Sequence, residues 1–194
     1  RFPETMPAKD VTITGTFAVI MTPPTGKSGL VYNGAALDLI TAGSSIIGTM
    51  QYSLDGTAYA TTIPQGADAG SYTVYYRVKG DGNYSDIAAQ SLDVTIASKT
   101  VESPTITFSE TSYTYDGTAI EPTVTVKDGG TTIPSTEYSV SYTSNTNVGT
   151  ATVTITDKEG GNYKVSGSAT FAISSADGKL TPPTGKSNLV YNGA

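Results

Sequence analysis

The chain has 194 residues, enough for one large domain or two small ones, and it contains no cysteine, histidine or tryptophan. Without cysteine there is no disulfide framework, and without histidine a Ser–His–Asp triad and the commonest zinc ligand are excluded. The net charge of −6, with 14% charged residues, argues against the basic face that nucleic acid binding requires.

The first segment resembles the end of a module. "TITGTFAVI" at Thr12–Ile20 is similar to "SGSATFAIS" at Ser166–Ser174, close to the other end of the chain. Recurrence at a long spacing is typical of repeat proteins. We therefore interpret residues 1–21 as the closing strand of a preceding module.

Two related modules follow this segment. "DAGSYTVYYRVKGDGNY" at Asp68–Tyr84 matches "NVGTATVTITDKEGGNY" at Asn147–Tyr163 in order and spacing. "LVYNGAALDL" at Leu30–Leu39 similarly matches "YTYDGTAIEP" at Tyr113–Pro122. We assign residues 22–97 to module 1 and residues 98–175 to module 2, each the size of a small sandwich domain.

Alternating hydrophobicity predicts strands in both modules. Tyr72, Val74, Tyr76 and Val78 share one face of a predicted strand, and shorter alternating runs occur in both modules. Six turn pairs separate the runs: Asn33-Gly34, Asp55-Gly56, Asp81-Gly82, Asp116-Gly117, Asp128-Gly129 and Gly160-Gly161. No ten-residue segment carries a helical apolar period. We predict an all-β protein of two tandem immunoglobulin-like sandwiches, with about seven short strands each.

A structural corner is predicted where the sixth strand of module 1 begins. The spacing of Asp68, Gly70 and Tyr72 resembles the immunoglobulin corner in which a tyrosine hydroxyl bonds back to the main chain. Module 2 has Ala151 in place of the tyrosine, so the same bond cannot form there.

The last segment repeats the first strand of module 1. "TPPTGKSNLVYNGA" at Thr181–Ala194 differs from Thr22–Ala35 only by Asn188 in place of Gly29. We interpret residues 176–194 as a linker and the opening strand of a next module, so that the chain is a window of a longer array. Both terminal strands would lack their own module, and we expect at least one to pair with a sheet edge.

"GKS" within this repeat does not predict a nucleotide site. A phosphate-binding loop needs a glycine five residues before Gly26 or Gly185, where Met21 and Leu180 stand. The adjacent prolines also remove N–H donors. An extended linker leading into a strand is the simpler interpretation.

Other chemistry has few candidates. Calcium would need six to eight oxygen ligands, and each hairpin offers only three: Asp81, Asn83 and Asp86, or Asp157, Glu159 and Asn162. Turn formation is the alternative role of these residues. Lys–Asn crosslinks have candidate lysines by number only: Lys27, Lys79, Lys99, Lys127 and Lys164. The acidic residues are scattered, which argues against the facing carboxylates of a glycosidase.

Tyr75 and Arg77 are the candidate ligand contacts. They are predicted to lie on the outer face of their strand, where a tyrosine can stack on a sugar or anchor a partner protein. An ordinary cross-strand contact is the alternative. We predict no catalytic, metal or cofactor residues.

Taken together, these modules resemble bacterial immunoglobulin-like repeats of large surface proteins. The Tyr-Asn-Gly start at Tyr32–Gly34 is similar to YGX-type repeats, and "FPETMPAKDVTITGTF" at Phe2–Phe17 resembles the end of a Listeria–Bacteroides repeat. The resemblance implies a cell-surface or secreted location and a non-enzymatic role as spacer or adhesion module. Its partners would be neighbouring modules of the same protein.

Two other functions remain open: an adhesin module that binds a glycan or host protein, and an accessory domain of a large secreted enzyme. A contiguous exposed aromatic patch would favour the adhesin. No stretch approaches the length of about 20 apolar residues that a membrane span needs, so we expect no membrane insertion by this segment.

Overall fold

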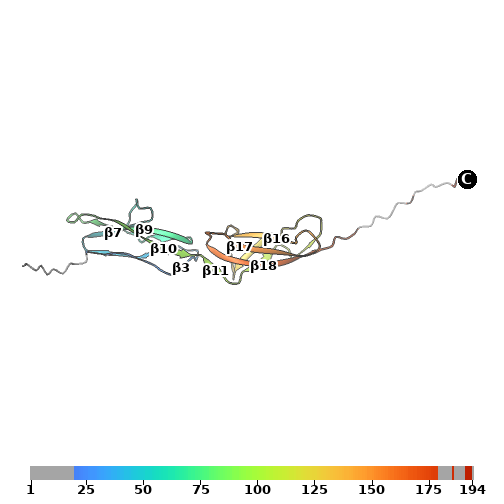
Figure 1. Cartoon of the computed structure of the whole chain (residues 1–194), viewed down its shortest axis with the longest axis horizontal. Helices are drawn as coiled ribbons and strands as arrows, with labels where there is room; N and C mark the ends of the chain where they lie inside the picture. The colour runs from blue at the N-terminus through green and yellow to red at the C-terminus, as the bar shows by residue number, and fades with distance from the viewer. Residues whose placement is uncertain (1–19, 179–184, 186–190, 194) are drawn as a thin grey trace, which may run out of the picture. The chain divides into compact units, whose positions relative to one another are not determined.

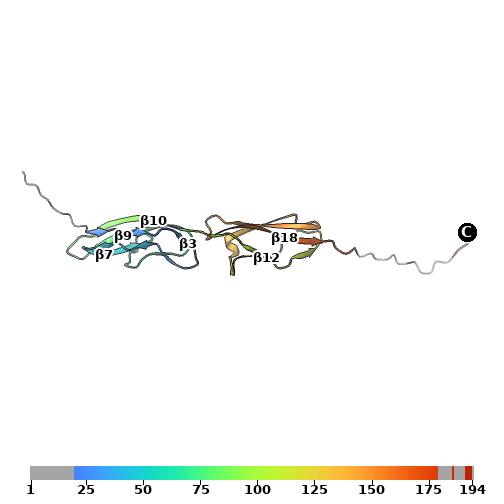
Figure 2. The same cartoon turned by 90° about the horizontal axis from the view of Figure 1, so that it is seen from below.

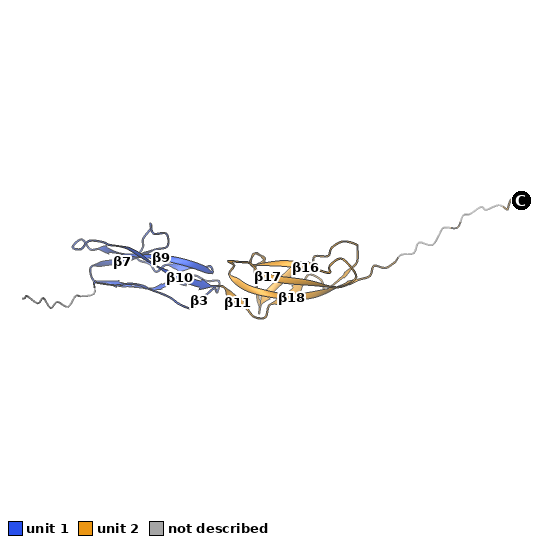
Figure 3. Ribbon diagram, in the orientation of Figure 1, with its two compact units in different colours: residues 1–97 blue, residues 98–194 orange. Residues whose placement is uncertain are grey.

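Strands make up nearly all of the regular structure in the computed structural model, which describes residues 20–178, 185 and 191–193. The one helical element among these residues is a short 3-10 turn, η1, at Ser135–Glu137. The predicted all-β class is therefore confirmed. The chain divides into two compact units, residues 1–97 (unit 1) and residues 98–194 (unit 2), coloured separately in Figure 3.

Unit 1 has a main sheet of four strands in the order β3-β10-β9-β7 (Figure 1). β3 pairs with β10 in parallel, and the other neighbours are antiparallel. Three short antiparallel ladders, β1–β6, β2–β5 and β4–β8, form the rest of the unit. The strands are β1 Met21–Thr22, β2 Thr25–Gly26, β3 Leu30–Val31, β4 Leu37–Asp38, β5 Ile40–Thr41, β6 Ser44–Ser45, β7 Gly48–Ser53, β8 Gln65–Gly66, β9 Gly70–Gly80 and β10 Ile87–Ala97.

The main sheet and the ladders of unit 1 share one buried core. Val74 and Val78 of β9 are fully buried, while Thr73, on the opposite face of the strand, is exposed, as the predicted alternation requires. Leu39 and Ile40 pack into the same cluster from the ladders. Burial of these apolar side chains is the main force that holds the unit together.

Residues 21–31 of unit 1 cross from the ladders to the main sheet. Pro23 and Pro24, which have no N–H to donate, separate β1 from β2. Gly29 then adopts a φ of 69°, after which β3 joins β10. Met21, which we expected in the preceding module, pairs with Ser45 and packs against this core. The described part of unit 1 thus begins before the expected boundary at residue 22.

A close backbone approach fixes glycine at position 43. A Cβ at Gly43 would lie 2.4 Å from the carbonyl oxygen of Thr22, closer than any side chain tolerates. The N–H of Gly43 donates to the hydroxyl of Tyr52 at 3.0 Å. This contact ties the ladder β1–β6 to the edge strand β7.

Unit 2 also has a larger and a smaller sheet, seen from a second side in Figure 2. The larger sheet has the order β11-β18-β17-β16, and β13 also pairs with β18; the smaller sheet has the order β12-β14-β15. The strands are β11 Lys99–Val101, β12 Thr105–Phe108, β13 Ser112–Thr114, β14 Val124–Asp128, β15 Thr131–Thr132, β16 Tyr138–Thr143, β17 Gly149–Asp157 and β18 Tyr163–Ser174.

Unit 2 has its own core. Ala151, Val153 and Ile155 of β17 are buried together with Val126 of β14, so both sheets contribute to one cluster. The ring of Phe171 meets those of Phe108 and Tyr113 edge to face, at centroid distances of 5.8 and 5.3 Å.

The predicted turns have the backbone geometry that their residue types suggest. Each of the six predicted turn pairs contains a glycine with positive φ. Two related turns each contain a hydrogen bond of the same type: Ala35 N–H donates to Asn33 Oδ1 at 2.9 Å, and Thr118 N–H donates to Asp116 Oδ1 at 2.8 Å.

The two predicted terminal segments, residues 1–21 and 176–194, lie outside the described residues except for residues 20–21, 176–178, 185 and 191–193, and so does most of the sequence on which the expected edge pairing depends. The carbonyl of Ile20 accepts a hydrogen bond from Ile46 N–H at 3.2 Å. Within the described residues, no helix has the length and apolar character needed to cross a lipid bilayer.

Candidate functional site

Arg77 is the centre of a polar and aromatic cluster on the outer face of β9. It lies opposite Gln51 of β7, and its Nε donates to Gln51 Oε1 at 3.0 Å. Its guanidinium carbon lies 4.1 Å from the centroid of the Tyr59 ring, a cation–π contact. Both side chains are half-buried, so part of this stack is open to solvent.

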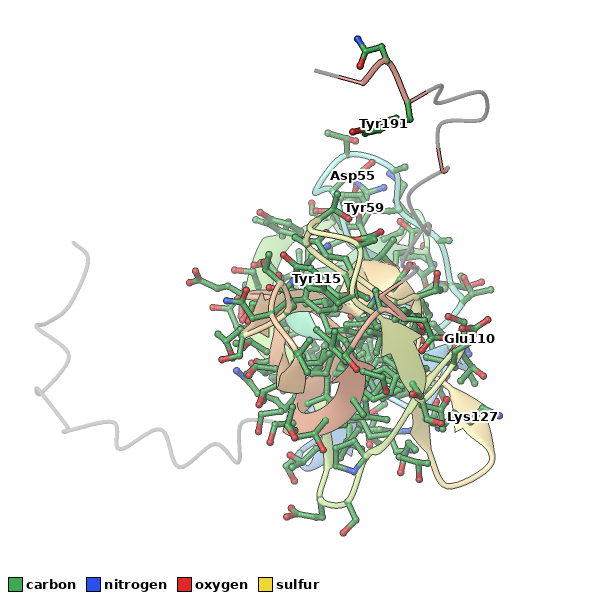
Figure 4. The ribbon with its side chains drawn as sticks, turned by 90° about the vertical axis from the view of Figure 1, so that its right-hand side faces the viewer. Asp55, Tyr59, Glu110, Tyr115, Lys127 and Tyr191 are labelled. Carbon is green, nitrogen blue, oxygen red and sulfur yellow. The ribbon has the colours of Figure 1, made fainter. Side chains whose placement is uncertain are left out.

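The loop after β7 brings Tyr59 to Arg77. Asp55 Oδ1 accepts hydrogen bonds from the hydroxyl of Ser53 at 2.7 Å and from the N–H groups of Thr57 and Ala58 at 2.7 and 2.8 Å. The loop then returns to the sheet edge, where Tyr52 and Ala60 exchange two backbone hydrogen bonds. In Figure 4, Asp55 and Tyr59 are labelled close together, above the centre of the view.

The hydrogen bonds of this loop change the acidity of Asp55. The hydroxyl of Ser53, followed by the N–H groups of Thr57 and Ala58, holds the pKa of the Asp55 carboxyl well below its usual range. Donors that favour the charged carboxylate always act in this direction. The ionised form of Asp55 is therefore part of what orders the loop.

Tyr75 lies beside the same loop. It pairs with Ser53 on one side and Ser91 on the other, and its ring is half-buried. A Cβ on Gly56 would lie 3.5 Å from the ring, which places the loop backbone against it. The structure thus brings the two predicted contact residues, Tyr75 and Arg77, to one surface.

Sequence reasoning missed two members of this cluster, Gln51 and Tyr59. Gln51 depends on the register between β7 and β9, which pairs it with Arg77. Tyr59 depends on a loop that folds back onto the sheet. Neither the strand register nor the fold of an irregular loop follows from alternation alone.

The predicted corner residues come together at the start of β9. The hydroxyl of Tyr72 donates to the carbonyl oxygen of Asp68 at 2.8 Å and accepts from Asp68 N–H at 3.2 Å. Gly70 between them has a φ of 148°. The Tyr72 ring lies against Gly66, where a Cβ would come within 2.7 Å of the ring. These bonds connect the turn at Asp68 to the start of β9.

Unit 2 uses other tyrosines for comparable bonds. Ala151 stands in the corner position and is buried. The hydroxyl of Tyr142 donates to Pro122 O at 2.6 Å, and that of Tyr113 donates to Glu110 O at 3.0 Å. The corner of unit 1 thus has no direct counterpart, but side chain to backbone bonds occur at two other places.

Three of the candidate calcium ligands, Asp81, Asp86 and Asp157, have protein partners. Asp86 accepts from Lys79 Nζ at 2.8 Å and from Gly80 N–H at 2.9 Å, and these two bonds lower the pKa of its carboxyl. Asp81 accepts from the N–H of Asn83, as in a local turn. In the second hairpin, Asp157 pairs with Lys164 at 3.4 Å. Within residues 20–178, no three acidic side chains gather as metal ligands.

The candidate crosslinking lysines are mostly in exposed ion pairs. Lys27 pairs with Asp38, Lys79 with Asp86, Lys99 with Asp128 and Lys164 with Asp157, at Nζ–Oδ distances of 3.4, 2.8, 2.6 and 3.4 Å. The fifth, Lys127 of β14, lies opposite Thr105 and Thr132 and is half-buried.

The "GKS" segment of unit 1 is part of a ladder. Gly26 pairs with Ile40 of β5, and Lys27 N–H donates to Leu39 O at 2.8 Å. The Lys27 N–H, one of the donors that a phosphate loop would offer, is therefore directed at a neighbouring segment. Its copy in the last segment lies outside the described residues except for Gly185.

No cavity is detected in the described part of the chain, so the Tyr59–Arg77 cluster is a surface rather than a pocket. No family model matches the sequence, and neither the curated proteins nor the solved structures contain a significant match.

Proposed function

We propose that the chain is a non-enzymatic spacer segment of a bacterial cell-surface protein, built of two immunoglobulin-like sandwich modules in tandem. The observation that supports this most directly is the presence of two separate cores, one in each unit. Only Ser98 lies between the last strand of unit 1 and the first strand of unit 2. Self-contained modules on a short connection are the general design of tandem repeats.

The strand connections support the immunoglobulin-like assignment. In both units an early strand runs parallel to the last strand of the larger sheet, as β3 does with β10 and β13 with β18. In both units the last three long strands form an antiparallel sheet. A sandwich of two antiparallel sheets with one core has this arrangement.

Separate expression of residues 20–97 and 98–178 tests the modular part of this proposal. Each fragment should unfold cooperatively, with the same midpoint that the corresponding transition has in the full chain. Labelling of intact cells with an antibody against the chain tests the location. A fragment that fails to fold alone, or a chain confined to the cytoplasm, would contradict the spacer proposal.

The Tyr59–Arg77 cluster supports a second candidate function, an adhesin that binds a glycan or host protein. A half-exposed aromatic ring on a sheet can stack on a sugar ring, and here a guanidinium group lies beside the ring of Tyr59. A glycan array and a host-protein pull-down should be run with the full chain and with its Tyr59→Ala variant. Binding that Tyr59→Ala abolishes would favour the adhesin, and absence of binding would favour the spacer.

A further inference from the structure

The last strand of unit 2 is held on one edge by two parallel segments from the beginning of the unit. Residues 99–101 of β11 pair with residues 163–165 at the start of β18. Residues 112–114 of β13 pair with residues 172–174 at the end of the same strand. The other edge of β18 pairs antiparallel with β17. The first and last strands of the unit are therefore direct neighbours.

This pairing determines how the unit responds to tension. A pull along the chain enters unit 2 at Ser98 and leaves it after Ser174. It draws β11 toward its N-terminal end and β18 toward its C-terminal end. Because the two strands are parallel, these are opposite directions along a common axis, and the pair is loaded in shear. The hydrogen bonds between parallel strands are evenly spaced, so they share the force.

Several kinds of contact hold β11 in place. Lys99 N–H donates to Asn162 O at 2.8 Å, and the hydroxyl of Ser98 donates to Gly161 O at 2.7 Å. The ammonium group of Lys99 also reaches Asp128 of β14 at 2.6 Å. The first residues of unit 2 are thus bonded both to the region where β18 begins and to the smaller sheet.

Apolar contacts accompany these bonds. Val101 and its partner Val165 are 5% and 2% exposed, so water has little access to the β11–β18 ladder. At the other end, Tyr115 N–H donates to Ser174 O at 2.8 Å, and the Tyr113 ring packs against Phe171. Buried hydrogen bonds are harder for water to replace than exposed ones.

We propose that β11, β13 and β18 make unit 2 a module that resists mechanical tension along the chain. The tension passes from β11 directly into β18, so the β11–β18 pair has to slide before the rest of the unit is loaded. β13 follows only after β12, because the chain reaches it through that strand. This inference rests on the proposed spacer function, since a spacer transmits force between its two ends.

Single-molecule force spectroscopy tests this proposal directly. The chain has no cysteine, so a pair of introduced cysteines defines the two pulling points. Ala97→Cys with Ser175→Cys pulls unit 2 along the chain. Asn147→Cys with Ser175→Cys pulls apart the open end of the β17–β18 hairpin, where Gly149 pairs with Ile173. We expect a higher unfolding force in the first geometry, because shear breaks the bonds together and the hairpin opens them one after another.

Two variants, one in β11 and one in a control strand, test whether the β11–β18 ladder resists the tension. Lys99→Pro, at the first position of β11, removes both the N–H that donates to Asn162 and the ammonium group that reaches Asp128. Thr131→Pro, at the first position of β15, changes a strand that does not contact β18. Lys99→Pro should lower the unfolding force when the unit is pulled along the chain and leave the unfolding force in the hairpin geometry unchanged. Thr131→Pro should change the unfolding force by the same amount in both geometries.

Equal unfolding forces in the two geometries of the unmodified strands would overturn the proposal, as would a Lys99→Pro loss of the same size in both. The first comparison stands even if Lys99→Pro does not fold. Failure of the spacer function can be told apart from failure of this proposal, because the two have separate measurements. The glycan and host-protein binding experiments test the spacer function, and their result does not alter the comparison of unfolding forces.

Discussion

Tyr72 shows how a single hydroxyl connects a turn to a strand. It donates to and accepts from the same residue, Asp68, four positions earlier. Removing it in Tyr72→Phe should destabilise unit 1 by about 1 kcal/mol, the typical net contribution of a hydrogen bond. Urea unfolding of residues 20–97 measures this, with Tyr84→Phe, whose ring is exposed, as the matched control. Equal midpoints for Tyr72→Phe and the unmodified fragment would contradict the role of the corner.

Asp55 predicts a dependence on pH. Its folded-state pKa lies below the usual 3.8, so its stabilisation is fully present above that pH and is lost as pH falls from there toward the folded-state pKa. The Asp55 carboxyl should remain ionised at about pH 3, where an unperturbed aspartate is mostly protonated. A carboxyl NMR titration of the full chain resolves this, and a midpoint near 3.8 would show that the loop does not hold the charge.

At the scale of the element, the path of residues 21–31 from the β1–β6 ladder to the main sheet depends on glycine at position 43. In Gly43→Ala the new methyl group meets the carbonyl of Thr22, and backbone atoms cannot move aside without separating β1 from β6. The cost should be in the range of overpacking, about 1–3 kcal/mol. Gly130→Ala is the control, because a Cβ there has no neighbour within 4 Å. For each variant, the urea midpoint of the unit that carries it is compared with that of the unmodified chain. Shifts of equal size for Gly43→Ala and Gly130→Ala would contradict this contact.

The elements differ in how far the sequence could predict them. β9 and β17 followed from alternation because one face of each is buried in a core. The strands β1, β2 and β3 within residues 21–31 could not be predicted in this way, because they depend on partners far along the chain and on the prolines between β1 and β2. The same limit applies to the candidate site. Tyr75 and Arg77 could be placed on an outer face, but Tyr59 reached them through a loop whose geometry comes from the bonds of Asp55.

For the whole molecule, removal of metal should have no effect on stability. Three acidic residues of the two hairpins already bond to a lysine or to a backbone N–H group: Asp81 to Asn83, Asp86 to Lys79 and Gly80, and Asp157 to Lys164. Thermal unfolding with and without a chelator should therefore give the same midpoints for both units. A fall of several degrees in the presence of chelator would instead indicate that a cation replaces some of these partners.

The conformation of Gly29 also bears on the 14-residue stretch that recurs in the sequence. Its φ of 69° is costly for most residues, yet a Cβ at that position would have open space around it. Any restriction on the residue type therefore comes from the backbone and not from packing. Asparagine enters this region more readily than other residues with a side chain. The one difference between the two copies of the 14-residue repeat, Gly29 and Asn188, is the exchange that this restriction most easily admits. Backbone conformation at Gly29, rather than side-chain packing, thus limits which residues this position can accept.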